Sequence, residues 1–340
     1  MSERRRATLL ASIAATLLAC GAIVFLVTRD DGGSAGGGNK GTTVDSSPPR
    51  TGPVDVTRVP TEGIPASVAV GAGRVWAADP LGGILERIAA TTLLSTPVEV
   101  DGFPTDVVAG ARKAWIPLPD LASVQAIGRT GPASSPTKLD GLPFQLALDR
   151  GEGTLWAMSQ RSLQPLDAES GRPLSGPVPL DRPASAVAAG GGRAWVALGG
   201  GELAAFEVGG SEPVARATQD GVFTLSLGEG SLWALSRSGR VAALDPEQGD
   251  ETEASGQVAG ALAIGAGLGC VWVVTDGGEV VRLDPDSGRR VGNAIDAGRP
   301  INAGEPGYAP LPADVALGAG AAWVAGPGGR SLLRVTPGCD

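Results

Sequence analysis

Four aspartates recur at intervals of about 40 residues and offer carboxylates suited to acid–base chemistry or to binding a divalent cation. They are Asp101, Asp140, Asp181 and Asp220. Each begins the same connection of a repeated unit, and glycine follows three of the four. Because Asp-Gly is a dipeptide that favours turns, we interpret these aspartates as turn residues and expect no catalytic role for them.

Other residues that serve as metal ligands or nucleophiles are scarce. The chain of 340 residues contains no histidine and only three cysteines, of which Cys20 lies in an apolar N-terminal segment. Zinc and copper sites are built mainly from histidine and cysteine, and no loop has the spacing of oxygen ligands that calcium requires. The sequence therefore predicts no metal site, no cofactor and no identifiable catalytic residue.

The residues that remain are positioned by a repeat that seven tryptophans mark. Their successive spacings are 39, 41, 39, 38, 39 and 51 residues, and a glycine stands five residues before each. The tryptophans are Trp76, Trp115, Trp156, Trp195, Trp233, Trp272 and Trp323. A period near 40 with short apolar segments and glycine turns is typical of a β-propeller, one blade per period. The sequence predicts an all-β, seven-bladed β-propeller over residues 53–340.

Each repeat is expected to form four antiparallel strands, A to D, as residues 261–296 illustrate most clearly. The tryptophan falls on strand B, where we expect it to wedge between neighbouring blades. The last repeat ends after its third strand. We therefore predict that the N-terminal strand Val54–Val59 completes the last blade and removes a free sheet edge.

The longest tryptophan spacing, from Trp272 to Trp323, contains an insertion of about 12 residues between blades six and seven. This connection holds Arg299, Glu305 and Tyr308, the last being the only tyrosine of the chain. Departures from a repeat are places where a binding site can be added without disturbing the fold. We predict a ligand-binding site there, and the alternative is a tolerated surface insertion.

Five further residues are predicted to share a face with this insertion. Phe103 and Phe144 occupy equivalent D–A connections, and Arg161, Asp276 and Arg330 belong to turns between strands B and C. These connections and turns surround one mouth of the central channel of a propeller. A concave mouth with a few aromatic rings and mixed charges suits a ligand-binding site.

The two cysteines outside the N-terminal segment are expected at turns on one face of adjacent blades. Cys270 begins strand B of the sixth repeat, and Cys339 occupies a C–D turn position in the seventh. A disulfide between them would persist outside the cytoplasm and fix the C-terminal tail. Two interpretations stay open, a Cys270–Cys339 disulfide or two separate thiols.

The N-terminal 52 residues differ from the repeats. Residues 7–28 are uncharged and long enough to cross a membrane as a helix, and the arginines in residues 1–6 favour a cytoplasmic N-terminus. We predict a short cytoplasmic tail over 1–6, a transmembrane signal anchor over 7–28 and a flexible Gly/Ser/Pro linker over 29–52. The alternatives are a bacterial lipoprotein lipidated at Cys20 and a cleaved secretory signal.

The segment "VAVGAGRVWAAD" of the first repeat, with "GEVVRLDPDSGRRVGNAIDAG" of the sixth, resembles the YVTN and virginiamycin B lyase-like superfamily of seven-bladed propellers. The resemblance covers roughly residues 53–340 and implies the fold. For the lyase itself it implies a histidine base and a bound magnesium ion. Because this chain has no histidine, that base has no counterpart here.

The net charge of −9 and the lack of a basic stripe make nucleic acid an unsuitable partner. We therefore predict a membrane-anchored, extracytoplasmic β-propeller that acts as a non-catalytic binding, sensor or scaffold module. Its partner would be a protein, a glycan or a small ligand. The alternatives are a lyase or lactonase-type enzyme that uses carboxylates and a divalent metal, and an architectural protein without a discrete ligand.

Overall fold

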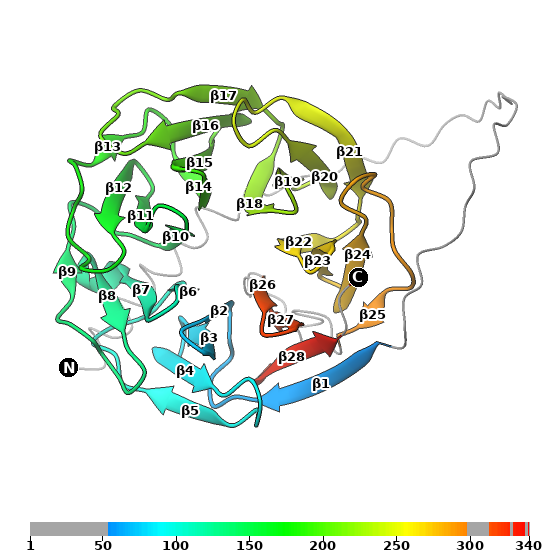
Figure 1. Cartoon of the computed structure of the whole chain (residues 1–340), viewed down its shortest axis with the longest axis horizontal. Helices are drawn as coiled ribbons and strands as arrows, with labels where there is room; N and C mark the ends of the chain where they lie inside the picture. Colours follow the sequence, from blue (N-terminus) through cyan, green and yellow to red (C-terminus); the bar gives the residue numbers. More distant parts are fainter. Residues whose placement is uncertain (1–53, 298–312, 327–328, 337–338, 340) are drawn as a thin grey trace, which may run out of the picture. The chain divides into compact units, whose positions relative to one another are not determined.

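The computed structural model describes residues 54–297, 313–326, 329–336 and 339 of the chain. Within these residues every regular element is a β-strand except one short 3-10 helix, η1 (Pro119–Leu121). The strands form seven four-stranded antiparallel sheets arranged in a ring (Figure 1). The prediction of an all-β, seven-bladed β-propeller is confirmed. The described residues contain no helix long and apolar enough for a membrane span, and the predicted anchor at 7–28 lies outside them.

The blades are numbered along the chain, and the strands of each are given in order from A at the channel to D at the rim. Blade 1 has β2 (Ser67–Gly71), β3 (Arg74–Asp79), β4 (Ile84–Ile88) and β5 (Ser95–Val98). Blade 2 has β6 (Val108–Ala109), β7 (Ala114–Leu118), β8 (Ser123–Ile127) and β9 (Thr137–Lys138). Blade 3 has β10 (Gln145–Asp149), β11 (Thr154–Ser159), β12 (Ser162–Asp167) and β13 (Val178–Pro179). Blade 4 has β14 (Ala184–Gly190), β15 (Arg193–Leu198), β16 (Glu202–Glu207) and β17 (Ala215–Thr218).

Blade 5 has β18 (Val222–Gly228), β19 (Ser231–Ser236), β20 (Arg240–Leu244) and β21 (Glu251–Gln257). Blade 6 has β22 (Ala261–Gly267), β23 (Cys270–Thr275), β24 (Glu279–Leu283) and β25 (Ile295–Asp296). Blade 7 has β26 (Asp314–Gly318), β27 (Ala321–Ala325) and β28 (Ser331–Thr336), and its fourth strand is β1 (Asp55–Pro60). β1 pairs antiparallel with β28, from Asp55 opposite Thr336 to Pro60 opposite Ser331.

The core of the protein lies between blades rather than at the centre of the ring. The strands nearest the channel contact one another in a closed series, β2, β6, β10, β14, β18, β22, β26 and again β2. Seven clusters of buried apolar side chains separate adjacent blades, and each contains one of the seven tryptophans. Each tryptophan is at most 2% exposed. The expectation that the tryptophans wedge between blades is therefore correct.

The glycine five residues before the tryptophan makes specific contacts in several blades. In blade 1 the indole Nε1 of Trp76 donates to the carbonyl of Gly71 at 3.1 Å, and the equivalent bond occurs in blades 5, 6 and 7. In blades 2 and 4 the indole instead donates to a C–D turn of the next blade. A Cβ on Gly71 would lie 2.6 Å from two carbonyl oxygens of blade 2, so a larger residue does not fit there.

A disulfide joins Cys270 at the start of β23 to Cys339, with the two Cα atoms 5.6 Å apart. The backbone N–H of Cys339 also donates to the carbonyl of Leu268 at 3.0 Å. Cys339 is thus attached to the A–B turn of blade 6 and to the first residue of β23.

Candidate functional site

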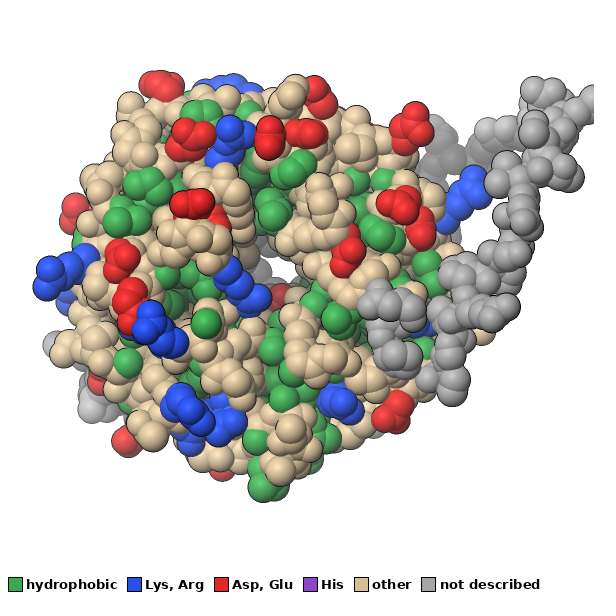
Figure 2. All heavy atoms as spheres, viewed as in Figure 1, with side chains coloured by type: hydrophobic (Ala, Val, Ile, Leu, Met, Phe, Trp, Pro, Cys, Tyr) green, Lys and Arg blue, Asp and Glu red, His purple; other side chains and the backbone are tan. Residues whose placement is uncertain are grey.

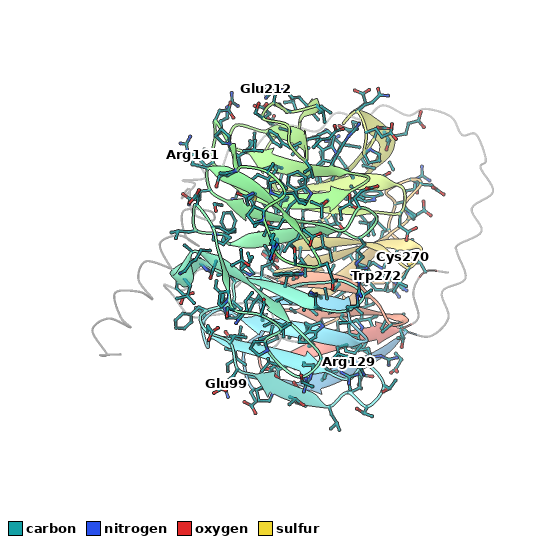
Figure 3. All side chains as sticks on the ribbon, turned by 60° about the vertical axis from the view of Figure 1, so that its left-hand side comes forward. Glu99, Arg129, Arg161, Glu212, Cys270 and Trp272 are labelled. Atoms are coloured by element: carbon teal, nitrogen blue, oxygen red, sulfur yellow. A yellow bond between two sulfur atoms is a disulfide. The ribbon has the colours of Figure 1, made fainter. Side chains whose placement is uncertain are left out.

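The D–A connections and the B–C turns lie on one face of the ring, which we call the D–A face. B–C turns donate backbone hydrogen bonds to D–A connections, as from Arg237 to Gly221 at 2.9 Å and from Asp276 to Gly260 at 2.8 Å. Figure 3 shows Arg161, from a B–C turn, and Cys270, beside an A–B turn, on opposite sides of the ring. The predicted grouping of these loops on one face is correct.

The ring has a narrow central opening, and on the face shown in Figure 2 acidic and basic side chains are interspersed around it. The side chain of Arg150 joins three blades beside an A–B turn. Arg150, which follows β10, donates from Nη2 to the carbonyls of Val70 at 3.0 Å and Ala109 at 2.9 Å. This guanidinium therefore connects blade 3 to blades 1 and 2 on the face opposite the D–A face.

Four polar side chains at or just before the start of strand A link successive blades around the channel at the D–A face. Each accepts a hydrogen bond from the backbone N–H of the following blade. The bonds are Val68 N to Asp314 Oδ2 at 2.9 Å, Val107 N to Ser67 Oγ at 3.2 Å, Leu146 N to Asp106 Oδ2 at 2.8 Å, and Val187 N to Gln145 Oε1 at 3.1 Å. This inner belt connects blades 7, 1, 2, 3 and 4.

Two carboxylates of the inner belt share one hydroxyl. Ser67 Oγ lies 2.7 Å from Asp106 Oδ1 and 3.0 Å from Asp314 Oδ2. A serine hydroxyl has one proton to donate and two lone pairs to accept with. The Ser67 hydroxyl therefore donates to only one of the two carboxylates at a time. Its contact with the other becomes a hydrogen bond when that other carboxyl group carries a proton.

The surroundings of this pair favour such a proton. Desolvation by the surrounding protein, together with the nearby charge of Asp106, raises the pKa of Asp314 from 3.8 to about 6. Desolvation also raises the pKa of Asp106, although its hydrogen bonds from Leu146, Ser67 and Val107 oppose the shift. Below about pH 6, Asp314 thus carries a proton that it can donate to Ser67, and Ser67 in turn donates to Asp106.

The chemical capacity of this pair is limited by its hydrogen bonds. Both oxygens of Asp106 accept from Ser67, Val107 or Leu146, and both oxygens of Asp314 accept from the backbone N–H of Val68 or Val315. A general base needs a lone pair directed at substrate. Because these lone pairs already accept bonds from the protein, the role that we assign to the two carboxyl groups is to connect blades 7, 1, 2 and 3. Sequence patterns had not identified this pair.

The two predicted aromatic residues contribute to packing at the D–A face. Phe103 is half-buried, and a Cβ on Gly83 of the blade 1 B–C turn would lie 3.1 Å from its ring. Phe144 is half-buried against the cluster between blades 3 and 4. Its carbonyl accepts a hydrogen bond from Thr105 Oγ1 at 2.9 Å. The two residues hold equivalent positions in the sequence repeat, but the Phe103 ring lies against blade 1 and Phe144 packs on the cluster between blades 3 and 4.

The predicted charged residues of the B–C turns are exposed and come from separate blades. Arg161 of blade 3 donates from Nη1 to the carbonyl of Asp181 at 2.8 Å, and the carbonyl of Arg330 of blade 7 accepts from Thr61 N at 3.1 Å. Asp276 belongs to blade 6, and its side chain lies against Gly260. In the part of the chain that the structure describes, no hydrogen bond or ion pair joins any two of these three residues. Arg299, Glu305 and Tyr308 lie outside the described residues, so their placement stays a prediction.

The four repeated aspartates are spread around the same face. All four are exposed, and Oδ2 of Asp101 accepts from Gln125 Nε2 at 2.7 Å. Among the described residues, no three or more histidine, cysteine, aspartate or glutamate side chains are grouped to hold a metal ion.

Sequence reasoning also missed a pocket. It has a volume of about 360 Å³, and Gln219, Ser236, Ser238, Arg240 and Glu251 are among its lining residues. No conspicuous motif marks this pocket in the sequence. The feature that could have indicated it is a pair of small residues, two alanines at paired positions of one blade.

Comparisons with known proteins relate this chain to others by fold alone. No family model matches it, and no curated protein is similar to it in sequence. Its structure is similar to that of BamB from Moraxella catarrhalis, with 13% sequence identity, a TM-score of 0.54, and coverage of 81% of this chain and 84% of that chain. It is also similar to a chain in the crystal structure of the Mitotic Checkpoint Complex, with 10% identity, a TM-score of 0.67, and coverage of 88% of this chain and 99% of that chain. Both similarities support the propeller fold.

Proposed function

We propose that this chain is a membrane-tethered propeller that acts outside the cytoplasm as a non-catalytic binding, sensor or scaffold module, with a protein docking on its D–A face. The observation that carries this proposal is the engagement of the carboxylates at the channel mouth. All four oxygens of Asp106 and Asp314 accept hydrogen bonds from the protein itself. The best placed acid–base groups thus serve the scaffold, while exposed side chains of several blades remain available for a partner.

Three further points support the proposal. The apolar stretch at 7–28 is long enough to span a membrane, and the arginines before it favour a cytoplasmic N-terminus. The repeat "VAVGAGRVWAAD" resembles the YVTN and virginiamycin B lyase-like propellers. One of the structures similar in fold is a chain of a complex. We also propose that β1 closes the ring, and its antiparallel pairing with β28 supports this proposal.

Photo-crosslinking of the full chain in its native membrane tests partner binding. A photoreactive amino acid is placed at Arg161, Asp276 or Arg330 on the D–A face, and at exposed Arg289 in a C–D turn as the matched control. We expect the same crosslinked protein from at least two D–A positions and not from Arg289. Replacement of both Glu305 and Tyr308 by alanine is expected to abolish this product. Equal crosslinking from Arg289, or no reproducible product from any D–A position, would contradict the proposal.

The membrane part is tested separately, because an anchor and a lipoprotein differ at Cys20. A signal anchor predicts that Cys20→Ser remains full length and resists extraction from membranes at alkaline pH. A lipoprotein predicts that the same variant accumulates as an unprocessed precursor, whereas the wild type loses its first 19 residues.

A second function, a lyase or lactonase-type enzyme that uses carboxylates and a divalent metal, is favoured by one observation. The pKa of Asp314 is raised to about 6, a value suited to proton transfer near neutral pH. This function predicts that Mg²⁺ or Ca²⁺ raises the melting temperature of the wild type but not that of Asp314→Asn. Identical melting temperatures with and without metal would exclude it.

A further inference from the structure

The pocket between blades 4 and 5 opens at the D–A face and has a volume of about 360 Å³. One wall is the end of β17 with the D–A connection after it, Thr218–Asp220, and the other is the side of blade 5 that faces blade 4. A second pocket, of about 320 Å³, adjoins β17 and shares Thr218. Volumes of this size lie in the range of small-ligand sites, about 300–1,000 Å³.

The pocket exists because blade 5 has two alanines where the other blades have at least one larger side chain. Ala234 of β19 lies opposite Ala242 of β20, and both line the pocket. The equivalent pairs in the other blades are Ala77–Glu86, Ile116–Gln125, Ala157–Gln164, Val196–Ala204, Val273–Val281 and Val324–Leu333. Blade 5 is therefore the blade in which both paired positions are alanine.

Three polar side chains at the pocket hold one another in place. Arg240 Nη1 donates to Gln219 Oε1 at 2.7 Å, and Gln219 Nε2 donates to Glu251 Oε2 at 2.7 Å. Arg240 Nη2 also donates to Glu251 Oε1, which closes a ring of three side chains. A site whose polar groups are fixed before binding loses less conformational entropy when a ligand arrives.

Hydroxyl groups line the same pocket. Ser236 is 6% exposed, and its Oγ accepts from the backbone N–H of Arg240 at 3.1 Å and lies 2.8 Å from Ser238 Oγ. Thr218 supplies another hydroxyl to the lining. The pocket therefore offers donors and acceptors on its walls and the two alanine methyl groups deeper in.

The charges of the lining disfavour an anionic ligand. Arg240 is neutralised by Glu251, and Asp220 adds one further negative charge, so an anion finds no free cation here. A wholly apolar ligand would leave the polar walls without solvent. A neutral, hydroxyl-rich molecule matches both constraints, since its hydroxyls pair with the walls and its C–H groups contact the methyl groups.

We propose that the pocket between blades 4 and 5 binds a neutral saccharide, oriented by Arg240, Gln219 and Glu251 over a floor of Ala234 and Ala242. This inference goes beyond the proposed docking of a protein partner. The photo-crosslinking tests the protein partner and the saccharide measurements test this pocket. A negative result in one therefore does not contradict the other proposal.

Saturation-transfer NMR on the full chain tests the inference. The protein is kept soluble in a detergent without a sugar headgroup, because maltoside detergents would compete for the site. The probes are glucose, mannose, galactose and N-acetylglucosamine, with glycerol and acetate as controls. We expect transfer to at least one saccharide and not to glycerol or acetate.

The decisive variant fills the pocket by copying blade 6. Ala234→Val combined with Ala242→Val recreates the Val273–Val281 pair, so we expect it to fold and to bind the saccharide at least about tenfold more weakly. Ala111→Val, at an exposed A–B turn of blade 2, is the matched control and should bind normally. Gln219→Ala opens the ring of side chains without altering the interior and should also weaken binding about tenfold.

Three results would overturn the inference. They are no transfer to any of the four saccharides, transfer to glycerol or acetate at the same strength, and unchanged saccharide binding in both Gln219→Ala and the double valine variant. If the double variant does not fold, Gln219→Ala decides the question alone.

Discussion

The Ser67 hydroxyl oxygen lies 3.0 Å from Oδ2 of Asp314, although 247 positions separate the two residues in the chain. This contact joins the first blade to the seventh at the channel. The same hydroxyl reaches Asp106 of the second blade at 2.7 Å. Three blades thus meet at one serine, and the protonation of Asp314 decides whether both contacts are attractive.

Asp314→Asn is expected to become stabilising, relative to the wild type, as the pH rises. The pKa of Asp314 is raised from 3.8 to about 6, so the folded state binds the proton more tightly than the unfolded state. Its contribution to stability is complete below about pH 4 and is lost as the pH rises through about 6, at most about 3 kcal/mol in total. Asparagine resembles the protonated acid and does not titrate. Urea unfolding from pH 4 to pH 7 measures the difference between the two proteins, and a difference independent of pH would contradict the shared proton.

Ser67→Ala is expected to destabilise the folded state by about 1–3 kcal/mol at pH 7, because it leaves two carboxyl groups facing each other without a donor between them. Ser185→Ala in blade 4 is the matched control. The Ser185 hydroxyl donates only to carbonyls, at 3.3 and 3.4 Å. Its removal should cost less than half as much. Equal losses in urea unfolding would show that Ser67 has no special role.

The arrangement of blades was predictable because the tryptophan of each repeat packs at the same place, between two blades. Each lies in the apolar cluster between two blades, so its spacing reports the spacing of blades. The inner belt was harder to recognise. Ser67, Asp106 and Asp314 each stand nine residues before a tryptophan, which places them at one level of the ring. Their shared proton depends on the curvature that brings neighbouring A strands together, and a linear pattern does not contain that curvature.

The pocket of blade 5 was not predictable for a different reason. A repeat is recognised from residues that recur in it. This pocket instead depends on a pair of side chains, at Ala234 and Ala242, that is smaller than the equivalent pairs of the other blades. These two alanines are separated by a turn and become one feature only through the register of β19 with β20. The insertion with Arg299, Glu305 and Tyr308 remains a prediction from the uneven repeat.

The disulfide between Cys270 and Cys339 is expected to stabilise the last blade. Its removal by Cys339→Ser should cost about 2–4 kcal/mol, because the bond closes a loop with a sequence separation of 69 residues. Reductant should lower the melting temperature of the wild type to that of the variant and leave the variant unchanged. If reductant leaves the melting temperature of the wild type unchanged, the disulfide either does not form or does not contribute to stability.

Tryptophans of different blades should differ in their tolerance of phenylalanine. Trp272 Nε1 donates to the carbonyl of Gly267 at 3.0 Å, whereas Trp156 Nε1 is buried and has no hydrogen-bond partner among the described residues. Both substitutions remove similar volume, but only Trp272→Phe also removes a hydrogen bond. We expect Trp272→Phe to lower the free energy of unfolding by about 1 kcal/mol more than Trp156→Phe. Equal losses in denaturant unfolding would mean that the indole bond adds nothing to stability.

The role of β1 in closing the ring is tested by two valines of the same strand. Val59 is fully buried in the cluster between blades 7 and 1, whereas Val56 is 38% exposed. If β1 holds the ring closed, Val59→Ala should lower the free energy of unfolding by about 2 kcal/mol, since it leaves a cavity at that junction. Val56→Ala should change it by less than about 0.5 kcal/mol. Val59→Ala should also raise hydrogen exchange in β28, which β1 pairs with, more than in β12 of the distant blade 3. Equal effects of the two substitutions, with no selective exchange in β28, would mean that the ring stays closed without β1.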